Sequence, residues 1–261
     1  MEPCHMNETC RAVIFDISGV LEFNGTVYPG AIELLDTLRA KGVHIRILTN
    51  STLKSRKSWA TKLIQMGFTV YEQEVITAAS ATAQYLRQLK PRSCWVMLKG
   101  EGLKEFKDFH HDLENPEYIV VGDYRDEFNF HNMNKALKLL LQGSKLIVMI
   151  PELVDSSMGA VELTVGAYGK ILEMASKVEA TYIGKPNKFI FEMALNTMDV
   201  PRDKVLMVGD RVTSDIAGAR RVEIKSVLVK TGEFKESDLA GNVQPDFMVN
   251  SILEIVQLNL F

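Results

Sequence analysis

The sequence has few cysteines, no excess of charge of either sign and no long apolar run. Only three of its 261 residues are cysteines, and their odd number and scattered positions, Cys4, Cys10 and Cys94, fit neither a disulfide framework nor a zinc site. The formal net charge of −3 argues against a nucleic-acid binder, which usually carries a basic excess. No apolar run approaches the roughly 20 residues that span a bilayer.

The first ten residues, MEPCHMNETC, also lack the charged start and apolar stretch of a secretory signal. We therefore expect a cytoplasmic protein with reduced thiols, and neither a membrane nor a nucleic acid as partner. About a quarter of the residues are charged, and nearly half are apolar, which is an ordinary composition for a globular chain.

Short apolar, β-branched runs alternate with amphipathic helical patterns in the two outer parts of the chain. Strands are predicted at 12–16, 43–50, 205–210 and 225–232, and helices at 31–42 and 55–68. Strand, helix, strand order favours right-handed crossovers and a parallel sheet covered on both faces. The predicted fold class is α/β, with a doubly wound, Rossmann-like parallel sheet.

The middle of the chain predicts a second, smaller α/β layer. CWVMLKG, YIVVGD and KLIVMIP have the pattern of strands, and NMNKALKLLLQG and VGAYGKILEMASKV that of helices. Removing this block leaves a complete strand and helix pattern on either side. We therefore predict a core formed by residues 1–78 and 179–261, with an inserted domain at 79–178.

Polar side chains stand where predicted strands end, and ligands of open parallel sheets bind outside those carboxyl ends. In chain order these residues are Asp16, Thr49, Asn50, Lys185 and Asp210, and Asp215 follows five residues after the last of them. Lys185 follows the strand-like TYIG and precedes a helix predicted to start at Pro186. A doubly wound sheet would bring them all to one rim.

This set of side chains predicts phosphoryl transfer. Asp16 and Asp210 can hold Mg²⁺, a hard ion that prefers oxygen ligands, and Asp16 keeps a second oxygen to attack phosphorus. Lys185, the Thr49 hydroxyl and backbone N–H groups would surround the phosphoryl oxygens. Asp215 is better placed to orient Lys185 or a metal-bound water than to attack.

Each of these residues alone has a simpler interpretation. Asp210 or Asp215 can be a helix cap, Thr49 with Asn50 can be a turn, and Lys185 can be a solvated surface side chain. Their occurrence at successive strand ends of one chain favours the functional interpretation.

Four segments carry a resemblance to a known family. DISGVL, LTN, GKPNKFIF and GDRVTSDI resemble, in that order, the four motifs of the haloacid dehalogenase superfamily. The long insert between the second and third resembles the C2-type cap of the NagD-like phosphatases. DISGVL, with its serine, resembles the sub-branch of the phospholysine/phosphohistidine/inorganic pyrophosphate phosphatases.

The resemblance implies roles for the residues at those motifs. Asp16 is the implied nucleophile. Mg²⁺ is implied to bind Asp16, the backbone carbonyl of Ser18 and Asp210. The substrate phosphate is implied to lie against Asp16, Ser18, Thr49, Asn50 and Lys185.

Ser18 departs from the pattern, since most phosphatases of the superfamily carry an aspartate there that protonates the leaving oxygen and later activates water. Loss of a general acid typically costs ~10²–10⁴ in rate. Leaving groups that need little protonation would tolerate this loss, which favours pyrophosphate, P–N bonds and aryl phosphates as substrates. The sequence leaves two alternatives open, which are a dehalogenase that needs no acid and a phospho-ligand sensor that has lost turnover.

Three further features give expectations about structure. Asn24-Gly25 is a strong signal for a two-residue hairpin turn. The cap stretch GDYRDEFN, near residues 123–130, is a candidate to face the cleft and set specificity. The resemblance also suggests a homodimer, because dimerisation is common in similar proteins.

Overall fold

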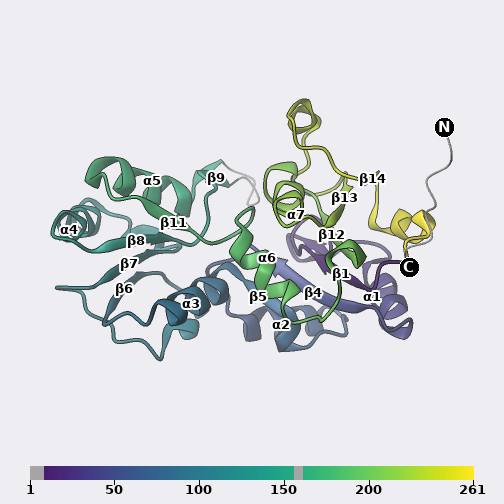
Figure 1. The fold of residues 1–261 in the computed structure, drawn as a ribbon, viewed down its shortest axis with the longest axis horizontal. Coiled ribbons are helices and arrows are strands. Elements are labelled where there is room, and N and C mark those ends of the chain that lie inside the picture. Colours follow the sequence, from purple (N-terminus) through teal and green to yellow (C-terminus); the bar gives the residue numbers. More distant parts are fainter. Residues whose placement is uncertain (1–8, 156–160) are drawn as a thin grey trace.

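A computed structural model describes residues 9–155 and 161–261, and Cys4 lies outside these ranges. Figure 1 shows two sheets side by side along the longest axis of the molecule. The larger is a six-stranded sheet in the order β14-β13-β12-β1-β4-β5, and every pairing in it is parallel. Its strands are β1 (Ala12–Phe15), β4 (His44–Thr49), β5 (Val75–Thr77), β12 (Val205–Gly209), β13 (Lys225–Val229) and β14 (Phe247–Val249).

Helices cover both faces of this sheet because its strands are apolar on both sides. In β1, Val13 and Phe15 join one buried cluster, while Ala12 and Ile14 join another. The first cluster includes the buried faces of α1 (Ala31–Ala40) and α2 (Arg56–Gln65). The second includes those of α3 (Ala78–Leu89), α6 (Lys188–Leu195) and α7 (Ala217–Arg221). The predicted doubly wound α/β fold is confirmed.

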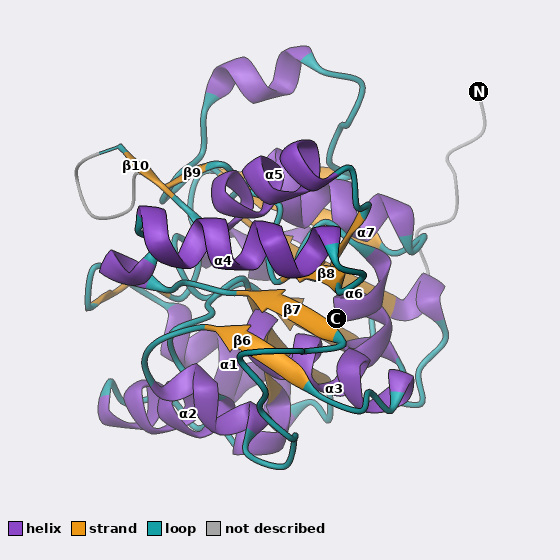
Figure 2. Ribbon diagram, turned by 90° about the vertical axis from the view of Figure 1, so that its left-hand side faces the viewer, coloured by secondary structure: helices purple, strands orange, loops and turns teal. Residues whose placement is uncertain are grey.

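The smaller sheet has four parallel strands in the order β11-β8-β7-β6. They are β6 (Cys94–Met97), β7 (Tyr118–Val121), β8 (Lys145–Val148) and β11 (Ala180–Tyr182). Two helices, α4 (Phe130–Leu141) and α5 (Val165–Ser176), pack together, and α5 contacts β7 and β8 (Figure 2). The predicted α/β pattern of the insert therefore forms a sheet of its own.

The chain crosses between the two sheets near residue 183. β11 pairs with β8 in the smaller sheet, so that sheet extends past residue 178, where the sequence pattern placed the end of the insert. The helix predicted to start at Pro186 begins instead at Lys188, because Asn187 closes a turn on the Gly184 carbonyl. The division into two domains stays a prediction.

Two short antiparallel hairpins complete the strands. β2 (Glu22–Phe23) and β3 (Thr26–Val27) are joined by Asn24 and Gly25, with φ of 49° and 85°, so the predicted two-residue turn is confirmed. The second hairpin joins β9 (Val154–Asp155) to β10 (Glu162–Leu163). Short helical turns are η1 (Glu72–Glu74), η2 (Glu101–Phe106), η3 (Arg125–Glu127), η4 (Arg202–Lys204), η5 (Val212–Ile216), η6 (Glu236–Ala240) and η7 (Ile252–Leu258).

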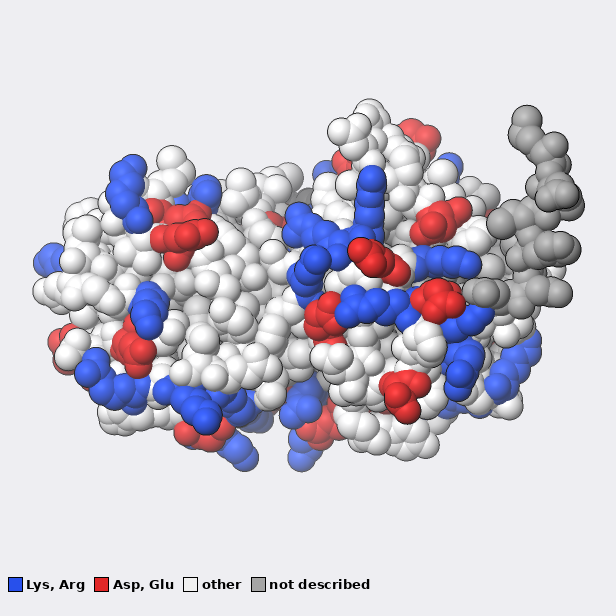
Figure 3. Space-filling model, in the orientation of Figure 1, with Lys and Arg blue, Asp and Glu red and all other residues white. Residues whose placement is uncertain are grey.

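The distribution of charged side chains and the state of the described cysteines match what the composition predicts. Basic and acidic side chains are interspersed over the face drawn in Figure 3. Cys10 and Cys94 are buried free thiols. Among the residues that the structure describes, no helix has the length and apolar character needed to cross a bilayer.

Candidate active site

Three buried aspartates converge at the carboxyl ends of β1 and β12. These strands are neighbours and run parallel, so Asp16, after β1, and Asp210, after β12, lie at the same edge of the sheet. Asp215, on η5, joins them, and carboxylate oxygens of the three residues lie within 4.8 Å of one another. The predicted meeting of distant acidic residues at one rim is therefore seen.

The Lys185 ammonium lies inside this cluster, with 2 % of the residue exposed. Its Nζ is 2.8 Å from Asp16 Oδ1 and 2.7 Å from Asp215 Oδ1, and it donates to the Leu48 carbonyl at 3.1 Å. An ammonium has three N–H donors, so these contacts use all of them. Burial alone would lower the pKa of Lys185, but the two carboxylates outweigh it and the pKa is raised, which keeps the side chain charged.

The aspartates carry more negative charge than one ammonium balances. Burial raises the pKa of Asp16 to about 6, although the Lys185 charge opposes the rise. Burial, together with the charges of Asp16 and Asp215, raises the pKa of Asp210 well above its ordinary value. Asp210 Oδ1 is buried and accepts no hydrogen bond from the residues that the structure describes. Such an unsatisfied oxygen beside a second carboxylate fits a divalent cation bound by oxygen ligands.

Two glycines allow the backbone to come close to Asp210. A Cβ atom on Gly19 would lie 2.0 Å from Asp210 Oδ2, and one on Gly232 would lie 2.3 Å from it. Both glycines have positive φ, 86° and 59°, which other residues rarely adopt. The Glu233 N–H donates to the same oxygen at 2.7 Å, so backbone from two glycine segments and one N–H holds this carboxylate in place.

Asp215 orients Lys185. One of its oxygens binds the Lys185 ammonium, and the other accepts a 3.1 Å hydrogen bond from the Arg211 N–H. Asp215 is fully buried, so this pair fixes the ammonium relative to the start of η5. Lys185 itself follows β11 of the smaller sheet and not a strand of the larger one, yet it reaches the same rim.

Thr49 and Asn50 end β4 beside Lys185. Thr49 is buried, and its hydroxyl accepts from the Ser51 N–H at 3.2 Å. The Asn50 amide donates to the Lys185 carbonyl at 3.0 Å, and its oxygen accepts from the Lys185 N–H at 2.8 Å. The Asn50 side chain thus holds the lysine segment, and its predicted contact with phosphate stays a prediction.

A cleft of about 270 Å³ opens onto this cluster between the two sheets. Asp16, Ser18 and Lys185 line one side. Asp123 and Arg125, from the GDYRDEFN stretch of the smaller sheet, line the other. The interpretation that this stretch faces the cleft is therefore confirmed by its position.

Sequence reasoning missed four charged residues of this cleft, Glu152, Asp155, Arg211 and Glu233. Glu152 accepts a 2.7 Å hydrogen bond from the Asn50 amide, and Arg211 pairs with Glu233 at 2.9 Å. The available signal was that Glu152 follows the strand-like run KLIVMI, as a polar group just after a strand end. Arg211 adjoins Asp210 in the GDR segment.

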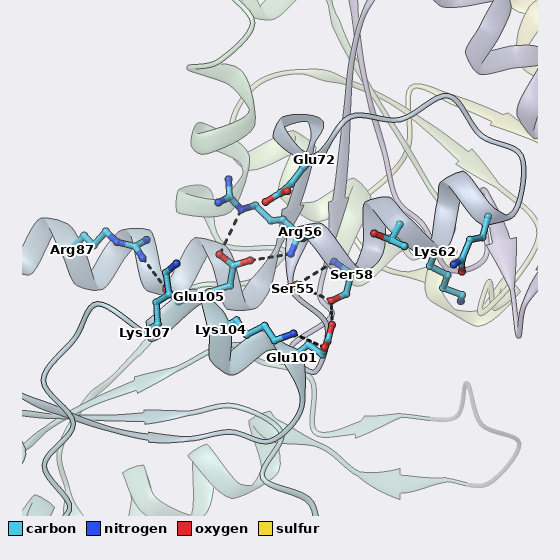
Figure 4. A pocket seen from close by; sticks show the side chains of 13 residues that line it. Ser55, Arg56, Ser58, Lys62, Glu72, Arg87, Glu101, Lys104, Glu105 and Lys107 are labelled. Atoms are coloured by element: carbon cyan, nitrogen blue, oxygen red, sulfur yellow. Dashed lines mark hydrogen bonds and ion pairs between the residues drawn. The ribbon is translucent and has the colours of Figure 1, made fainter.

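A larger groove of about 640 Å³ lies elsewhere, between α2 and η2 (Figure 4). Its carboxylates serve structural contacts, since Glu105 accepts from the Arg56 N–H at 2.9 Å and Glu101 binds Ser58 and Lys104. The groove is the wider of the two, but the buried cluster that can do chemistry lies at the smaller cleft.

Comparisons with known proteins agree with this site. A family model described as haloacid dehalogenase-like hydrolase matches residues 13–111, and a HAD-hydrolase-like model matches residues 182–255. The two matches contain the segments of Asp16 and Thr49 and of Lys185 and Asp210.

Similar proteins match along nearly the whole chain. The phospholysine phosphohistidine inorganic pyrophosphate phosphatase of Rattus norvegicus is 34 % identical over 260 residues, covering 96 % of this chain and 94 % of the relative. The haloacid dehalogenase-like hydrolase domain-containing protein 2 of Mus musculus is 31 % identical and covers 87 % of each chain.

Solved structures have the same fold. The 4-nitrophenylphosphatase of Thermotoga maritima matches with a TM-score of 0.89 at 26 % identity, covering 97 % of this chain and 99 % of its own. NagD of E. coli K-12 matches with a TM-score of 0.86 at 27 % identity, covering 94 % and 98 %. The buried acidic cluster on an α/β sheet is that of a hydrolase. The chain belongs to the haloacid dehalogenase-like hydrolases and, within them, to the NagD-like phosphoric hydrolases.

Proposed function

We propose that this protein is a Mg²⁺-dependent phosphatase that forms an aspartyl-phosphate on Asp16. The observation that carries the proposal is the position of Lys185, whose ammonium contacts Asp16 at 2.8 Å within the cluster that also contains Asp210. That contact orients the Asp16 carboxylate at the mouth of the cleft, where its second oxygen attacks phosphorus. Surface lysines and helix caps do not produce this arrangement.

The residues that would hold the metal are Asp16, Asp210 and the backbone carbonyl of Ser18. Asp210 Oδ1, buried without a partner among the described residues, supports this assignment. When bound, Mg²⁺ neutralises charge on the phosphoryl oxygens and on the two carboxylates. Lys185 adds a fixed positive charge on the far side of Asp16, with Thr49, Asn50 and Ser18 at the phosphate, and Asp215 keeps that charge in place.

The substrates we propose are small phosphorylated molecules with undemanding leaving groups, namely pyrophosphate, phosphoramidates with P–N bonds, and aryl phosphates. Ser18 supports this, because a serine hydroxyl cannot protonate an alkoxide leaving group near pH 7. The relatives named for phospholysine, phosphohistidine and pyrophosphate, and the one named for 4-nitrophenyl phosphate, are in keeping with such substrates. The insert at 79–178 forms the cap over the site in this proposal.

A panel of phosphorylated compounds tests the proposal. Pyrophosphate, phosphohistidine, phospholysine, aryl phosphates and sugar phosphates are incubated with Mg²⁺, with Asp16→Asn as the blank. We expect release of phosphate from the first four classes and little from sugar phosphates. Tight binding of phosphate analogues without hydrolysis of any compound would favour a phospho-ligand sensor. Release of halide from a haloacid that survives EDTA would favour a dehalogenase.

Ser18→Asp tests the argument about leaving groups. The variant supplies the missing acid, so its turnover of an alkyl phosphate should rise about 10²-fold. Turnover of p-nitrophenyl phosphate should change much less, since nitrophenolate leaves without a proton. An equal effect on both substrates would refute the leaving-group argument and leave the metal and nucleophile assignments unaffected.

A further inference from the structure

A serine at position 18 supplies neither an acid for the first reaction step nor a base for the second. A good leaving group removes the need for the acid only. In the first step Asp16 displaces the leaving group, and in the second step water must attack the phosphorylated Asp16. The second step is the same for every substrate, so it needs a group that takes a proton from water whatever the leaving group was. This inference rests on the proposed function and asks which residue activates that water.

Glu152 is the carboxylate whose position suits this task. It lines the cleft together with Asp16 and Ser18, and it lies four residues after the end of β8 in the smaller sheet. The nucleophile belongs to the larger sheet. In-line attack requires the water to approach phosphorus from the side opposite the Asp16 oxygen. Glu152 could activate that water if the phosphoryl group binds in the cleft that both residues line.

The structure holds Glu152 in place from two directions. Its backbone carbonyl accepts from the Gly166 N–H at 3.0 Å, and Gly166 has no room for a side chain because a Cβ there would lie 2.3 Å from that oxygen. Its Oε1 accepts from the Asn50 amide at 2.7 Å, across the cleft. Since Asn50 also binds the Lys185 backbone, the glutamate is fixed relative to the lysine that contacts Asp16.

The second carboxylate oxygen of Glu152, Oε2, differs from Oε1 in its surroundings. Oε2 is buried and has no hydrogen-bond partner among the described residues. A buried carboxylate oxygen without a donor is costly and calls for a donor such as water. The pKa of Glu152 is raised by burial, against the opposing charges of Arg211 and Lys185, and a higher pKa makes the carboxylate a stronger base.

We infer that Glu152 is the general base that activates water for hydrolysis of the phosphorylated Asp16, in place of the aspartate that position 18 lacks. In this step Oε2 takes one proton from water, and the water oxygen bonds to phosphorus. The bond between phosphorus and the Asp16 oxygen breaks, returning the Asp16 carboxylate. Phosphate then leaves, and protonated Glu152 gives its proton to solvent.

Glu152→Gln is the test, because the glutamine oxygen still accepts from the Asn50 amide while the group can no longer take a proton. With p-nitrophenyl phosphate and Mg²⁺ we expect a burst of about one nitrophenolate per enzyme, then steady turnover reduced about 100-fold. Phosphorylated Asp16 should accumulate and be detected by mass spectrometry. A Glu152→Gln, Ser18→Asp double variant should regain turnover.

Other outcomes separate the inference from the proposed function. Unchanged steady turnover, or a fall in burst and steady rates together without phosphoenzyme, would overturn the role of Glu152. Glu152→Asp should retain more turnover than the glutamine variant if the carboxylate is the base, whereas equal loss in both would point to positioning of Asn50. Glu105→Gln, in the groove away from the aspartates, is the control. If the natural enzyme hydrolyses none of the phosphorylated compounds in the panel, the proposed function itself fails.

Discussion

At the scale of single residues, the site depends on backbone that approaches a carboxylate closely. Gly19 and Gly232 let the main chain reach Asp210, since a Cβ at either position would overlap Asp210 Oδ2. Gly25 has nearly the same backbone conformation as Gly19, with φ of 85° against 86°, but nothing lies near its missing Cβ. Substitutions at Gly19 and Gly25 therefore separate the energetic cost of a positive φ from the cost of a steric clash with Asp210.

Gly19→Ala should damage the site more than Gly25→Ala. Either substitution places a Cβ in the left-handed region, at a cost of about 1–2 kcal/mol. At Gly19 the Cβ also meets Asp210 Oδ2, so displacement of that carboxylate should weaken Mg²⁺ binding at least tenfold. Urea unfolding gives the stability of both variants, and calorimetric titration with Mg²⁺ gives the affinity. Equal Mg²⁺ affinity in the two variants would contradict the steric argument.

The stabilising effect of Mg²⁺ should depend on pH. Since the folded pKa of Asp16 is raised to about 6, its contribution to metal-free stability is present below its unfolded value of 3.8 and is lost as pH rises through about 6. Protons compete with the metal below that pH.

The increase in Tm caused by Mg²⁺ should therefore be larger at pH 7.5 than at pH 5. Differential scanning fluorimetry with and without EDTA measures it. Asp16→Asn serves as the comparison and should lose the part of the pH dependence that comes from Asp16, while the part from Asp210 remains. A metal effect that is the same at both pH values in the natural protein would count against Asp16 as a ligand.

At the scale of elements, the first turn of α2 is stabilised by a segment that is distant in the sequence. Ser55 caps its first turn by accepting from the Ser58 N–H at 3.1 Å. Glu105, from η2 of the inserted segment, accepts from the Arg56 N–H at 2.9 Å and places its negative charge at the positive end of the helix. The helix start is thus completed by a residue almost fifty positions later, and local sequence does not show this.

Glu105→Ala should reduce the free energy of unfolding by about 1 kcal/mol, the usual cost of losing a cap interaction. Glu114→Ala is the matched control, because the Glu114 side chain is 85 % exposed and pairs with Lys135 at the surface. Such a surface pair is worth about 0–1 kcal/mol, so the control should change little. Urea unfolding monitored by circular dichroism compares them, and equal losses would show that Glu105 is no more than a surface charge.

At the scale of the whole molecule, one buried ammonium joins segments from three parts of the chain. Lys185 contacts the Leu48 carbonyl, Asp16 and Asp215, all of them buried. Removing one partner of a buried ion pair typically costs about 3–5 kcal/mol, because the other charge is left uncompensated.

Lys185→Met should therefore lower the free energy of unfolding by about 3–5 kcal/mol in the absence of metal. Mg²⁺ should recover part of this loss, since it also neutralises the aspartates. Lys170→Met is the control, since Lys170 is half-exposed and pairs with Glu173 one turn away on the same helix. Denaturation in EDTA and in Mg²⁺ gives the four values. A lysine variant as stable as the control would show that the cluster is held together without the ammonium.

The sequence predicted four of the six strands of the larger sheet and the meeting of Asp16 and Asp210, because strand ends in parallel sheets share an edge. Lys185 was also predicted at this edge, but it reaches it from β11 of the smaller sheet. The sequence did not predict that β11 belongs to the smaller sheet, since a three-residue strand carries no periodic signal and its partner β8 lies some thirty residues earlier. Nor did it predict Glu152 in the cleft, because that position depends on how the two sheets face each other.

The crossing near residue 183 places Lys185 in the short segment that connects the two sheets. The chain leaves β11 of the smaller sheet and enters α6 on the larger one. Between them, the Lys185 side chain contacts Asp16, the proposed nucleophile. A movement of the smaller sheet relative to the larger one would therefore displace Lys185 or be opposed by its contacts. We therefore expect that any widening of the cleft on substrate entry also shifts the ammonium that contacts Asp16.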